Sequence, residues 1–295
     1  MAAEAMPIIL PTVDMRRYDS AVNNQGISWV CTGDALTTAC ELVRRRGGFT
    51  QELSRLYSYF YSRKLANRPG QDGVTLDFVF PSSEQDGICS EAKWPFNLSN
   101  VDIEPHAAAR MEGATQRLIA WEKVRGQFEP STTPIWNAAV AALQGGSPLV
   151  INMRLGTKFG DIAGPIEEQR YPAINSQGQN NDFAGVAHSM AVVGYTPMYL
   201  IVKNSFGTEF GDGGYWALYS GVLQDVIEMY AVHDFAGYNA AGRRWIFASP
   251  GNTELARKWV AERATLERAQ EIIDVCKQHY ILRAELEIIM RWAAG

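Results

Sequence analysis

Apolar positions over residues 32–46 recur with the spacing of an α-helix that buries one face. They are Leu36, Ala39, Cys40, Leu42 and Val43. Three arginines and then two glycines, at residues 44–48, place cations near the C-terminal end of the segment and a stop signal after it. The pattern therefore predicts a helix over 32–46 with Cys31 at its N-terminus.

Two further helical segments precede any clear strand. Residues 53–66 have a helical pattern that ends at an Asn-Arg-Pro-Gly turn, and residues 74–80 begin a third helix. In the second half, a helix is expected over 134–143 and strands are expected over 148–153, 189–195, 199–203 and 214–218. Helices followed by strands predict an α+β fold of two lobes, with a ligand in the cleft between them.

The last segment has a different pattern. Residues 252–295 contain no proline and no glycine before the final residue, which predicts a long helix capped by Asn252 or Thr253. Apolar side chains recur about every seven residues along it, so it packs on its own domain or docks a partner subunit. We expect a main domain over 1–250 and a helical extension over 251–295.

Composition and charge exclude several classes of partner. The 295 residues are 46% hydrophobic, so the chain can bury a large core. Its 27 basic and 32 acidic residues give a net charge of -5 without a basic block, which argues against nucleic acid as a partner. The sequence shows no signal peptide and no apolar stretch of the roughly 20 residues that span a membrane. We expect no membrane partner, and a location in the cytoplasm or within a protein assembly.

The four cysteines, Cys31, Cys40, Cys89 and Cys276, are spread along the chain without a CxxC pair. This argues against a disulfide scaffold and against a zinc site, and we expect no metal and no cofactor. A cysteine at a helix N-terminus experiences the positive potential that favours a reactive thiolate. Cys31 is therefore a candidate nucleophile, and a buried, inert thiol is the alternative.

A cysteine nucleophile needs a histidine that accepts its proton and a polar group that orients this histidine. His188 stands at the edge of the strand expected over 189–195. The strand that returns beside it ends at Asn204, so the two side chains would lie together. A satisfied core histidine is the plain alternative for His188 taken alone. The other histidines lie in segments typical of surface or packing roles: His106, His233 and His279.

Three stretches of sequence resemble the papain-like (C1) cysteine peptidases. They are VDMRRYDSAVNNQG shortly before Cys31, HSMAVVGY from His188, and YLIVKNSFGTEFGDGGYWAL from Tyr199. The family pattern has NQG ahead of the nucleophile, H-A/S-V-x-V-V-G-Y around the histidine, and W-I-V-K-N-S-W-G around the asparagine. The resemblance covers about residues 8–240.

Transferred one residue at a time, the resemblance implies Cys31 as the nucleophile, His188 as the general base and acid, and Asn204 as the orienting residue. It implies that Gln25 donates to the oxyanion together with the Cys31 backbone N–H. The implied fold has a helical lobe and an antiparallel β lobe, here followed by the long C-terminal helix. The implied reaction is the hydrolysis of peptide bonds in peptides or proteins through an acyl-enzyme.

Parts of the first half are similar to bacterial members of the family, namely LSRLYSYFYSRKL, DGICSEAKWPF and the segment 72–75. In the family a glycine-containing segment lines the peptide groove, so the resemblance implies Gly73 and Asp72 as substrate-binding residues. A turn glycine with positive φ is the alternative for Gly73. The resemblance also places the base of the specificity pocket near Met229 to Asp234.

The sequence departs from the family pattern near the nucleophile. Trp29 and Val30 replace glycine and serine, and Ser28 replaces a cysteine, so the nearby disulfide of the family cannot form. Phe206 stands where an indole usually shields the histidine–asparagine hydrogen bond. The inhibitory propeptide of the family has no counterpart in this sequence.

Three functions are compatible with these residues. The first is a cysteine endopeptidase, and the second uses the same residues to transfer the acyl group to an amine. The third is a papain-fold structural protein of a larger assembly, such as a virion or secretion complex, with low or no activity. In that case the 252–293 helix would bind a protein partner or self-associate.

Overall fold

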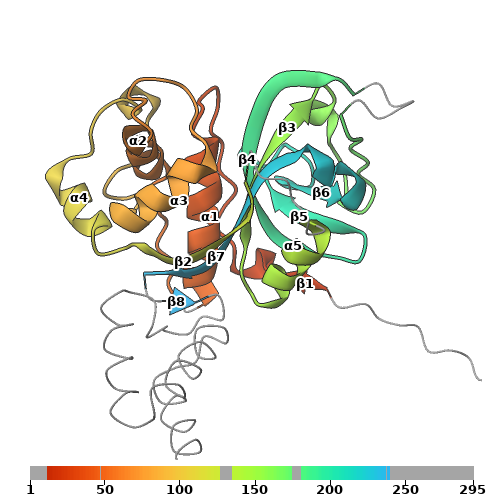
Figure 1. Cartoon of the computed structure of the whole chain (residues 1–295), viewed down its shortest axis with the longest axis horizontal. Coiled ribbons are helices and arrows are strands. Elements are labelled where there is room, and N and C mark those ends of the chain that lie inside the picture. The colour runs from red at the N-terminus through yellow and green to blue at the C-terminus, as the bar shows by residue number, and fades with distance from the viewer. Residues whose placement is uncertain (1–11, 47, 127–134, 175–180, 237, 240–295) are drawn as a thin grey trace, which may run out of the picture.

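The computed structural model describes residues 12–46, 48–126, 135–174, 181–236 and 238–239. Figure 1 shows a helical lobe on one side and a lobe built around a β-sheet on the other. The described α-helices are α1 (Cys31–Arg46), α2 (Arg55–Leu65), α3 (Leu76–Gln85), α4 (Ala107–Gly113) and α5 (Ile135–Gln144). The described strands are β1 (Val13–Asp14), β2 (Leu118–Arg125), β3 (Leu149–Gly156), β4 (Phe183–Tyr195), β5 (Tyr199–Lys203), β6 (Tyr215–Tyr219), β7 (Val226–Phe235) and β8 (Tyr238–Asn239). Short 3₁₀ helices occur at η1 (Arg16–Tyr18), η2 (Leu98–Asn100), η3 (Phe159–Asp161) and η4 (Ser220–Asp225).

One sheet forms the frame of the second lobe. Its strand order is β2-β7-β3-β4-β5-β6, with β1 paired to β4 and β8 paired to β7. All of these pairs are antiparallel. The four helices α1 to α4, which build the other lobe, precede the first long strand in the chain. The α+β class expected from the order of helical and strand patterns is confirmed.

Each lobe has its own hydrophobic core. Trp216 and Ile151 belong to the core of the β lobe, whereas Tyr57 and Phe80 belong to the core of the helical lobe. Strand β3 contributes to both, because Ile151 packs in the β-lobe core and its neighbour Val150 packs in the helical core. Successive side chains of a strand point to opposite faces. The sheet therefore covers its own core with one face and contacts the helical lobe with the other.

Helix α1 lies at the junction of the two lobes, where it packs against β4, β3 and β7. All of its residues from Cys31 to Arg44 are buried. It approaches α2 closely, since a Cβ atom added to Gly33 would lie 2.3 Å from the Arg55 carbonyl oxygen. The N-terminus of α1 is thus packed between elements of both lobes.

The helices and strands expected from the sequence occur in the described residues, with one difference that concerns the site. Strand β4 begins at Phe183 and not at 189, so His188 lies inside a strand and not at its edge. Residues 183–187 are mostly exposed and include a glycine. Because a strand was expected only where apolar residues form a run, this start of the strand was not detected. Strands β1, β2, β7 and β8 and helix α4 are additional to the expected elements.

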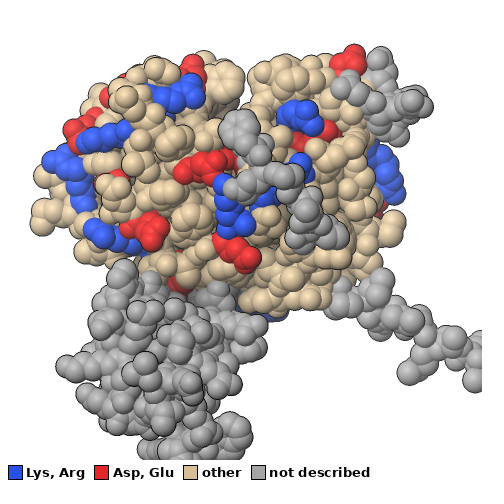
Figure 2. All heavy atoms as spheres, viewed as in Figure 1, with Lys and Arg blue, Asp and Glu red and all other residues tan. Residues whose placement is uncertain are grey.

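The long helix expected over 252–295, and with it the extension over 251–295, lies outside the described residues. Among the helices that are described, none is long and apolar enough to cross a membrane. Acidic and basic side chains are interspersed on the face shown in Figure 2. This distribution fits the small net charge of -5.

Candidate active site

Cys31 is the first residue of α1, and only 8% of it is exposed. Val30 before it is fully buried in the helical core, whereas Trp29 is 43% exposed, so the valine anchors the loop and the indole meets solvent. The Ser189 backbone hydrogen-bonds to the sulfur. Because Ser189 follows His188 in β4, the fold brings the thiol to the strand that carries the histidine.

His188 Nε2 lies 2.7 Å from Asn204 Oδ1. The two residues meet because β4 and β5 are antiparallel neighbours, in which Ala191 pairs with Lys203. The Ser205 backbone N–H also donates to Asn204 Oδ1, over 2.8 Å, which identifies this atom as the acceptor oxygen. Nε2 therefore carries the imidazole proton, and Nδ1 is the nitrogen that can accept one.

Aromatic rings cover the imidazole. Phe206 stacks on His188 with ring centroids 4.7 Å apart, and Phe159 meets it edge-on at 6.2 Å. Burial lowers the pKa of His188 to about 4, partly opposed by the hydrogen bond to Asn204. Burial also raises the pKa of Cys31 to about 11. Near pH 7 the resting site therefore holds a neutral thiol and a neutral imidazole.

Gln25 belongs to the same hydrogen-bond network. Its Oε1 accepts from Ser205 Oγ over 2.6 Å, and its backbone N–H donates to the Ser205 carbonyl over 2.8 Å. Its Nε2 donates to the Ser28 carbonyl over 2.7 Å, which uses one of the two amide hydrogens. A chain of hydrogen bonds thus links Gln25 through Ser205 and Asn204 to His188. The second amide hydrogen of Gln25 is left for a ligand.

A cavity of about 300 Å³ reaches Cys31. Trp29 forms part of its wall, so the indole borders the cavity instead of closing it. The helical lobe contributes the segment 72–75, and the sheet contributes Asn152, Ala187, Ser189 and Ile227. The residues expected to bind substrate, Asp72 and Gly73, therefore lie on the same cavity as the cysteine.

Gly73 has a φ of 71°, a left-handed conformation that favours glycine. Its backbone N–H donates to Tyr59 Oη over 2.9 Å. The turn geometry considered for Gly73 is therefore present. The carbonyl of Gly73, and not its amide, is left to hydrogen-bond a peptide in the cavity.

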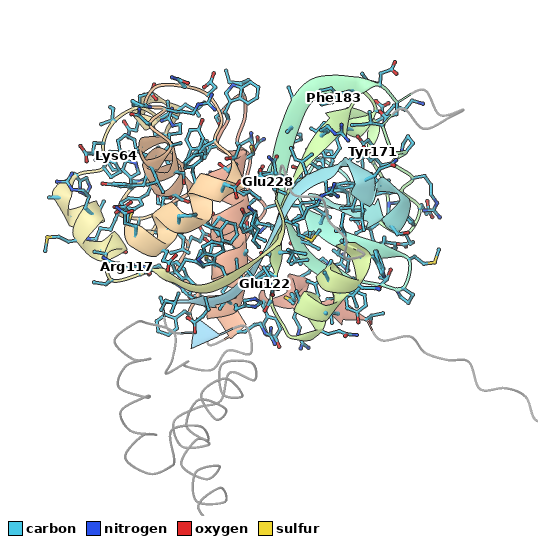
Figure 3. All side chains as sticks on the ribbon, viewed as in Figure 1. Lys64, Arg117, Glu122, Tyr171, Phe183 and Glu228 are labelled. Carbon is cyan, nitrogen blue, oxygen red and sulfur yellow. The ribbon has the colours of Figure 1, made fainter. Side chains whose placement is uncertain are left out.

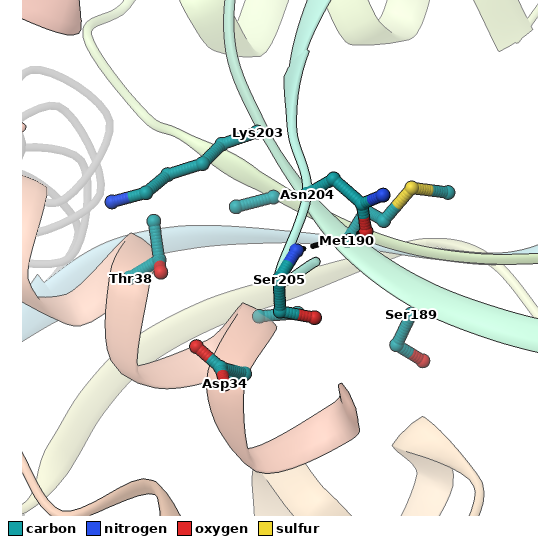
Figure 4. Close-up of a pocket in the computed structure, with 9 residues that line it drawn as sticks. Asp34, Thr38, Ser189, Met190, Lys203, Asn204 and Ser205 are labelled. Carbon is teal, nitrogen blue, oxygen red and sulfur yellow. Dashed lines mark hydrogen bonds between the residues drawn. The ribbon is translucent and has the colours of Figure 1, made fainter. Parts of the chain in front are cut away.

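A second cavity, of about 10 Å³, lies behind the site between α1 and strands β4 and β5 (Figure 4). Asp34, Ser189 and Asn204 are among its lining residues. Its volume corresponds to about one water molecule. It is too small for a substrate. The larger cavity is the candidate binding site because it reaches Cys31.

The other described histidines have structural contacts. His106 caps α4, because its Nδ1 accepts from the Ala109 backbone N–H over 3.1 Å. His233 Nδ1 lies 2.7 Å from Ser147 Oγ. His279 lies outside the described residues. In the part of the chain that the structure describes, no group of three or more His, Cys, Asp or Glu side chains could hold a metal ion.

Several site residues give no signal in the sequence: Asn152, Ser189, Ser205 and Ile227. Asn152 lies on the cavity because the register of the sheet pairs it with Ser189 of β4, which also lines the cavity. Met229 and Asp234, near which the base of the specificity pocket was expected, are fully buried in β7, and this expectation stays a prediction. Ile227, earlier in that strand, lines the cavity.

Comparison with solved structures finds the same fold in several cysteine proteases. Xylellain, a cysteine protease from Xylella fastidiosa, is 19% identical, with a TM-score of 0.61 over 76% of this chain and 86% of that chain. Procathepsin L 3 of the Tenebrio molitor larval midgut is 20% identical, with a TM-score of 0.56 over 77% of this chain and 71% of that chain. A Carica candamarcensis cysteine protease in complex with E-64 is 19% identical, with a TM-score of 0.56 over 75% of this chain and 97% of that chain.

The structural likenesses show a papain-like two-lobe fold. A search of curated protein sequences found no match. The family described as "Papain family cysteine protease" matches residues 19–235, well over half of the chain, including both lobes and the segments around Cys31, His188 and Asn204. The chain therefore belongs to the papain family of cysteine proteases.

Proposed function

We propose that this protein is a cysteine endopeptidase in which Cys31, His188 and Asn204 form a catalytic triad. The observation that supports this most strongly is the 2.7 Å contact between His188 Nε2 and Asn204 Oδ1, on a strand that also contacts the Cys31 sulfur. This bond fixes the tautomer and leaves Nδ1 to take the thiol proton.

The proposed reaction begins when His188 Nδ1 takes the proton of the Cys31 thiol and the sulfur attacks the peptide carbonyl carbon. The Cys31 backbone N–H and the second amide hydrogen of Gln25 stabilise the oxyanion. The C–N bond then breaks, the amine leaves with the proton from Nδ1, and a thioester remains. Water attacks the thioester while His188 takes its proton, which releases the acid and restores the thiol.

Peptides or proteins are the proposed substrates, bound in the 300 Å³ cavity between the lobes. Asp72 and Gly73 would bind them, with the Gly73 carbonyl accepting from a substrate N–H. The division into a peptidase domain over 1–250 and a helical extension over 251–295 that binds a partner stays a prediction. A location in the cytoplasm or in a protein assembly also stays a prediction.

Hydrolysis of fluorogenic peptides tests the proposal. We expect Cys31→Ala to lower kcat/KM by at least about a thousandfold, because removal of the nucleophile leaves only binding and oxyanion stabilisation. Cys89→Ala, at another buried free cysteine, is the matched control and should retain activity when it is folded. Equal activity of the wild-type and Cys31→Ala proteins would refute the proposal.

Two alternatives have distinct readouts. Acyl transfer would yield an amide product when a peptide amine is added, whereas hydrolysis yields the free acid in its presence. A structural protein with low or no activity is not favoured by the family match over both lobes. It would show no turnover of any peptide, with no difference between the wild type and Cys31→Ala.

A further inference from the structure

Asn152 of β3 lies on the cavity that reaches Cys31 and has no role in the proposed triad. It is 8% exposed, and its Nδ2 donates to Glu228 Oε2 over 2.8 Å. The two side chains meet because Asn152 and Glu228 are paired across β3 and β7. An amide that lines a substrate cavity and is anchored from behind is suited to recognising a ligand.

The partner of Asn152 determines which way its amide faces. Because Asn152 Nδ2 donates to Glu228 Oε2, the NH₂ group faces Glu228 and the carbonyl oxygen points away from it. The described residues provide no donor to Asn152 Oδ1, and this atom is not among the buried atoms that lack a partner. The oxygen is therefore accessible from the cavity as a free acceptor.

Glu228 itself is fully buried at the junction of the lobes (Figure 3). Its Oε2 also accepts from the Leu76 backbone N–H at the start of α3, over 3.4 Å. Its Oε1 is buried and has no hydrogen-bond partner among the described residues. Burial raises the pKa of Glu228, and the hydrogen bonds from Asn152 and from the Leu76 backbone partly oppose this rise. No cation is among the groups that shift it. A carboxyl group without a cation therefore lies directly behind Asn152.

The rest of the cavity combines apolar walls with a polar rim. Val74, Ala187 and Ile227 offer aliphatic surface to the stem of a long side chain. Arg68 and Asp72 also line the cavity, and their opposite charges offset one another. The acceptor oxygen of Asn152 and the carboxyl group behind it thus determine which polar group of a ligand the cavity favours, namely a hydrogen-bond donor.

We propose that Asn152, oriented by Glu228, selects peptides that place a long basic side chain, lysine or arginine, in this cavity. The stem of that side chain packs between Val74 and Ile227, and its cationic head donates to Asn152 Oδ1 and is attracted by Glu228. Asn152 is then a specificity-determining residue and Glu228 is a positioning residue. The inference rests on the proposed peptidase function, because it names the substrate class of that site.

Peptide binding to the Cys31→Ala protein tests the inference without turnover. A set of peptides is made that differ at a single position, which holds arginine, citrulline or norleucine, and each position is varied in turn. The dissociation constant of each peptide is measured by fluorescence anisotropy. At one position we expect arginine to bind at least about tenfold more tightly than norleucine, with citrulline, which keeps only some of the N–H donors and has no charge, between them. Norleucine binding as tightly as arginine at every position, or no binding of any peptide, would overturn the inference.

Variants in the same background locate the preference. Asn152→Leu should abolish the difference between arginine and norleucine, and Glu228→Gln should reduce it, because the carboxylate charge and the fixed amide orientation are both lost. A preference that disappears in Asp72→Asn but persists in Asn152→Leu would contradict the assignment, since the rim charge would then be the selector. If Asn152→Leu does not fold, the wild-type ratio and Glu228→Gln decide.

Turnover by the wild type separates this inference from the proposed function. Hydrolysis without a preference for basic side chains would refute only the inference. Selective binding of arginine peptides that depends on Asn152, without any hydrolysis by the wild type, would refute only the peptidase proposal.

Discussion

Burial determines the ionisation state of the two reacting groups. Cys31 and His188 are 8% and 4% exposed, and loss of solvent disfavours the charged form of each. The pKa of the thiol is raised to about 11 and that of the imidazole is lowered to about 4. Asp34, in the first turn of α1, adds to the rise for the thiol. Charge separation is therefore expected to accompany substrate attack and not to precede it.

The lowered pKa of His188 predicts an unusual acid limit of activity. The imidazole must be neutral to accept the thiol proton, and it remains neutral until the pH falls to about 4. We expect kcat/KM to hold from neutral pH to about pH 5 and to fall by about tenfold per pH unit below 4. Circular dichroism at each pH checks that the protein is folded. An acid limit near 6.5, the ordinary pKa of histidine, would contradict the prediction.

At this scale the sequence indicates some site residues and not others. Cys31 can be recognised because a helix start and a short motif surround it, and Asn204 because it ends an apolar strand. Asn152 and Ser205 cannot be recognised in this way. Their importance depends on which residues lie beside them in the folded sheet and loop, which local patterns do not contain.

Among the secondary-structure elements, the site depends most on the position of α1. Cys31 contacts the strand of His188 only because this helix packs between α2 and β4. Gly33 permits the close approach, with 2.3 Å between its would-be Cβ and the Arg55 carbonyl oxygen. Leu36 and Tyr57 continue the contact in the helical core.

We expect Gly33→Ala to destabilise the protein, although the same change at an open helical site stabilises by about 1 kcal/mol. The added methyl group must move α1 or α2, which costs about 1–3 kcal/mol by analogy with overpacked cores. Gly160→Ala is the matched control, because a Cβ there meets nothing within 4 Å, and its effect should be within about 0.5 kcal/mol. Urea denaturation measures both, and equal stabilities of the two variants would argue against close packing at Gly33.

Elements with regular apolar spacing are those that the sequence predicts well. Helix 32–46 and strand 199–203 were expected within a residue of α1 and β5, because each buries a continuous set of side chains. Strand β2 escapes prediction because its pairing with β7 has register shifts and many of its side chains are half exposed. Bulged strands of this kind lack the alternation by which strands are recognised.

At the scale of the molecule, the described residues are organised around two cores that share one sheet. Among the described residues, the last buried member of the β-lobe core is Ala231 and that of the helical core is Phe235, and Phe235 is also the last residue of the family match. Each core belongs to one lobe, and residues of both lobes line the cavity. That the peptidase domain ends before residue 250 stays a prediction.

A shortened chain tests this organisation. We expect residues 1–250 to fold cooperatively and to cleave peptides with a kcat/KM within about twofold of the full chain, because no described core contact is removed. Thermal denaturation and peptide hydrolysis measure the two properties. A chain that fails to fold, or that loses more than about tenfold in kcat/KM, would show that the residues after 250 belong to the peptidase domain.

The most direct test of the account is the reaction of the intact protein with the epoxide inhibitor E-64 at neutral pH, followed by mass-spectrometric mapping of the modified cysteine. We predict that Cys31, which lines the cavity, reacts at least about a hundredfold faster than a free thiol, because His188 takes its proton as the sulfur attacks. Cys40 and Cys89 should stay unmodified because they are fully buried, and His188→Ala should remove the excess rate of Cys31. Modification of Cys31 no faster than the free thiol, or an unchanged rate in His188→Ala, would contradict the assignment of Cys31 and His188 as a catalytic pair.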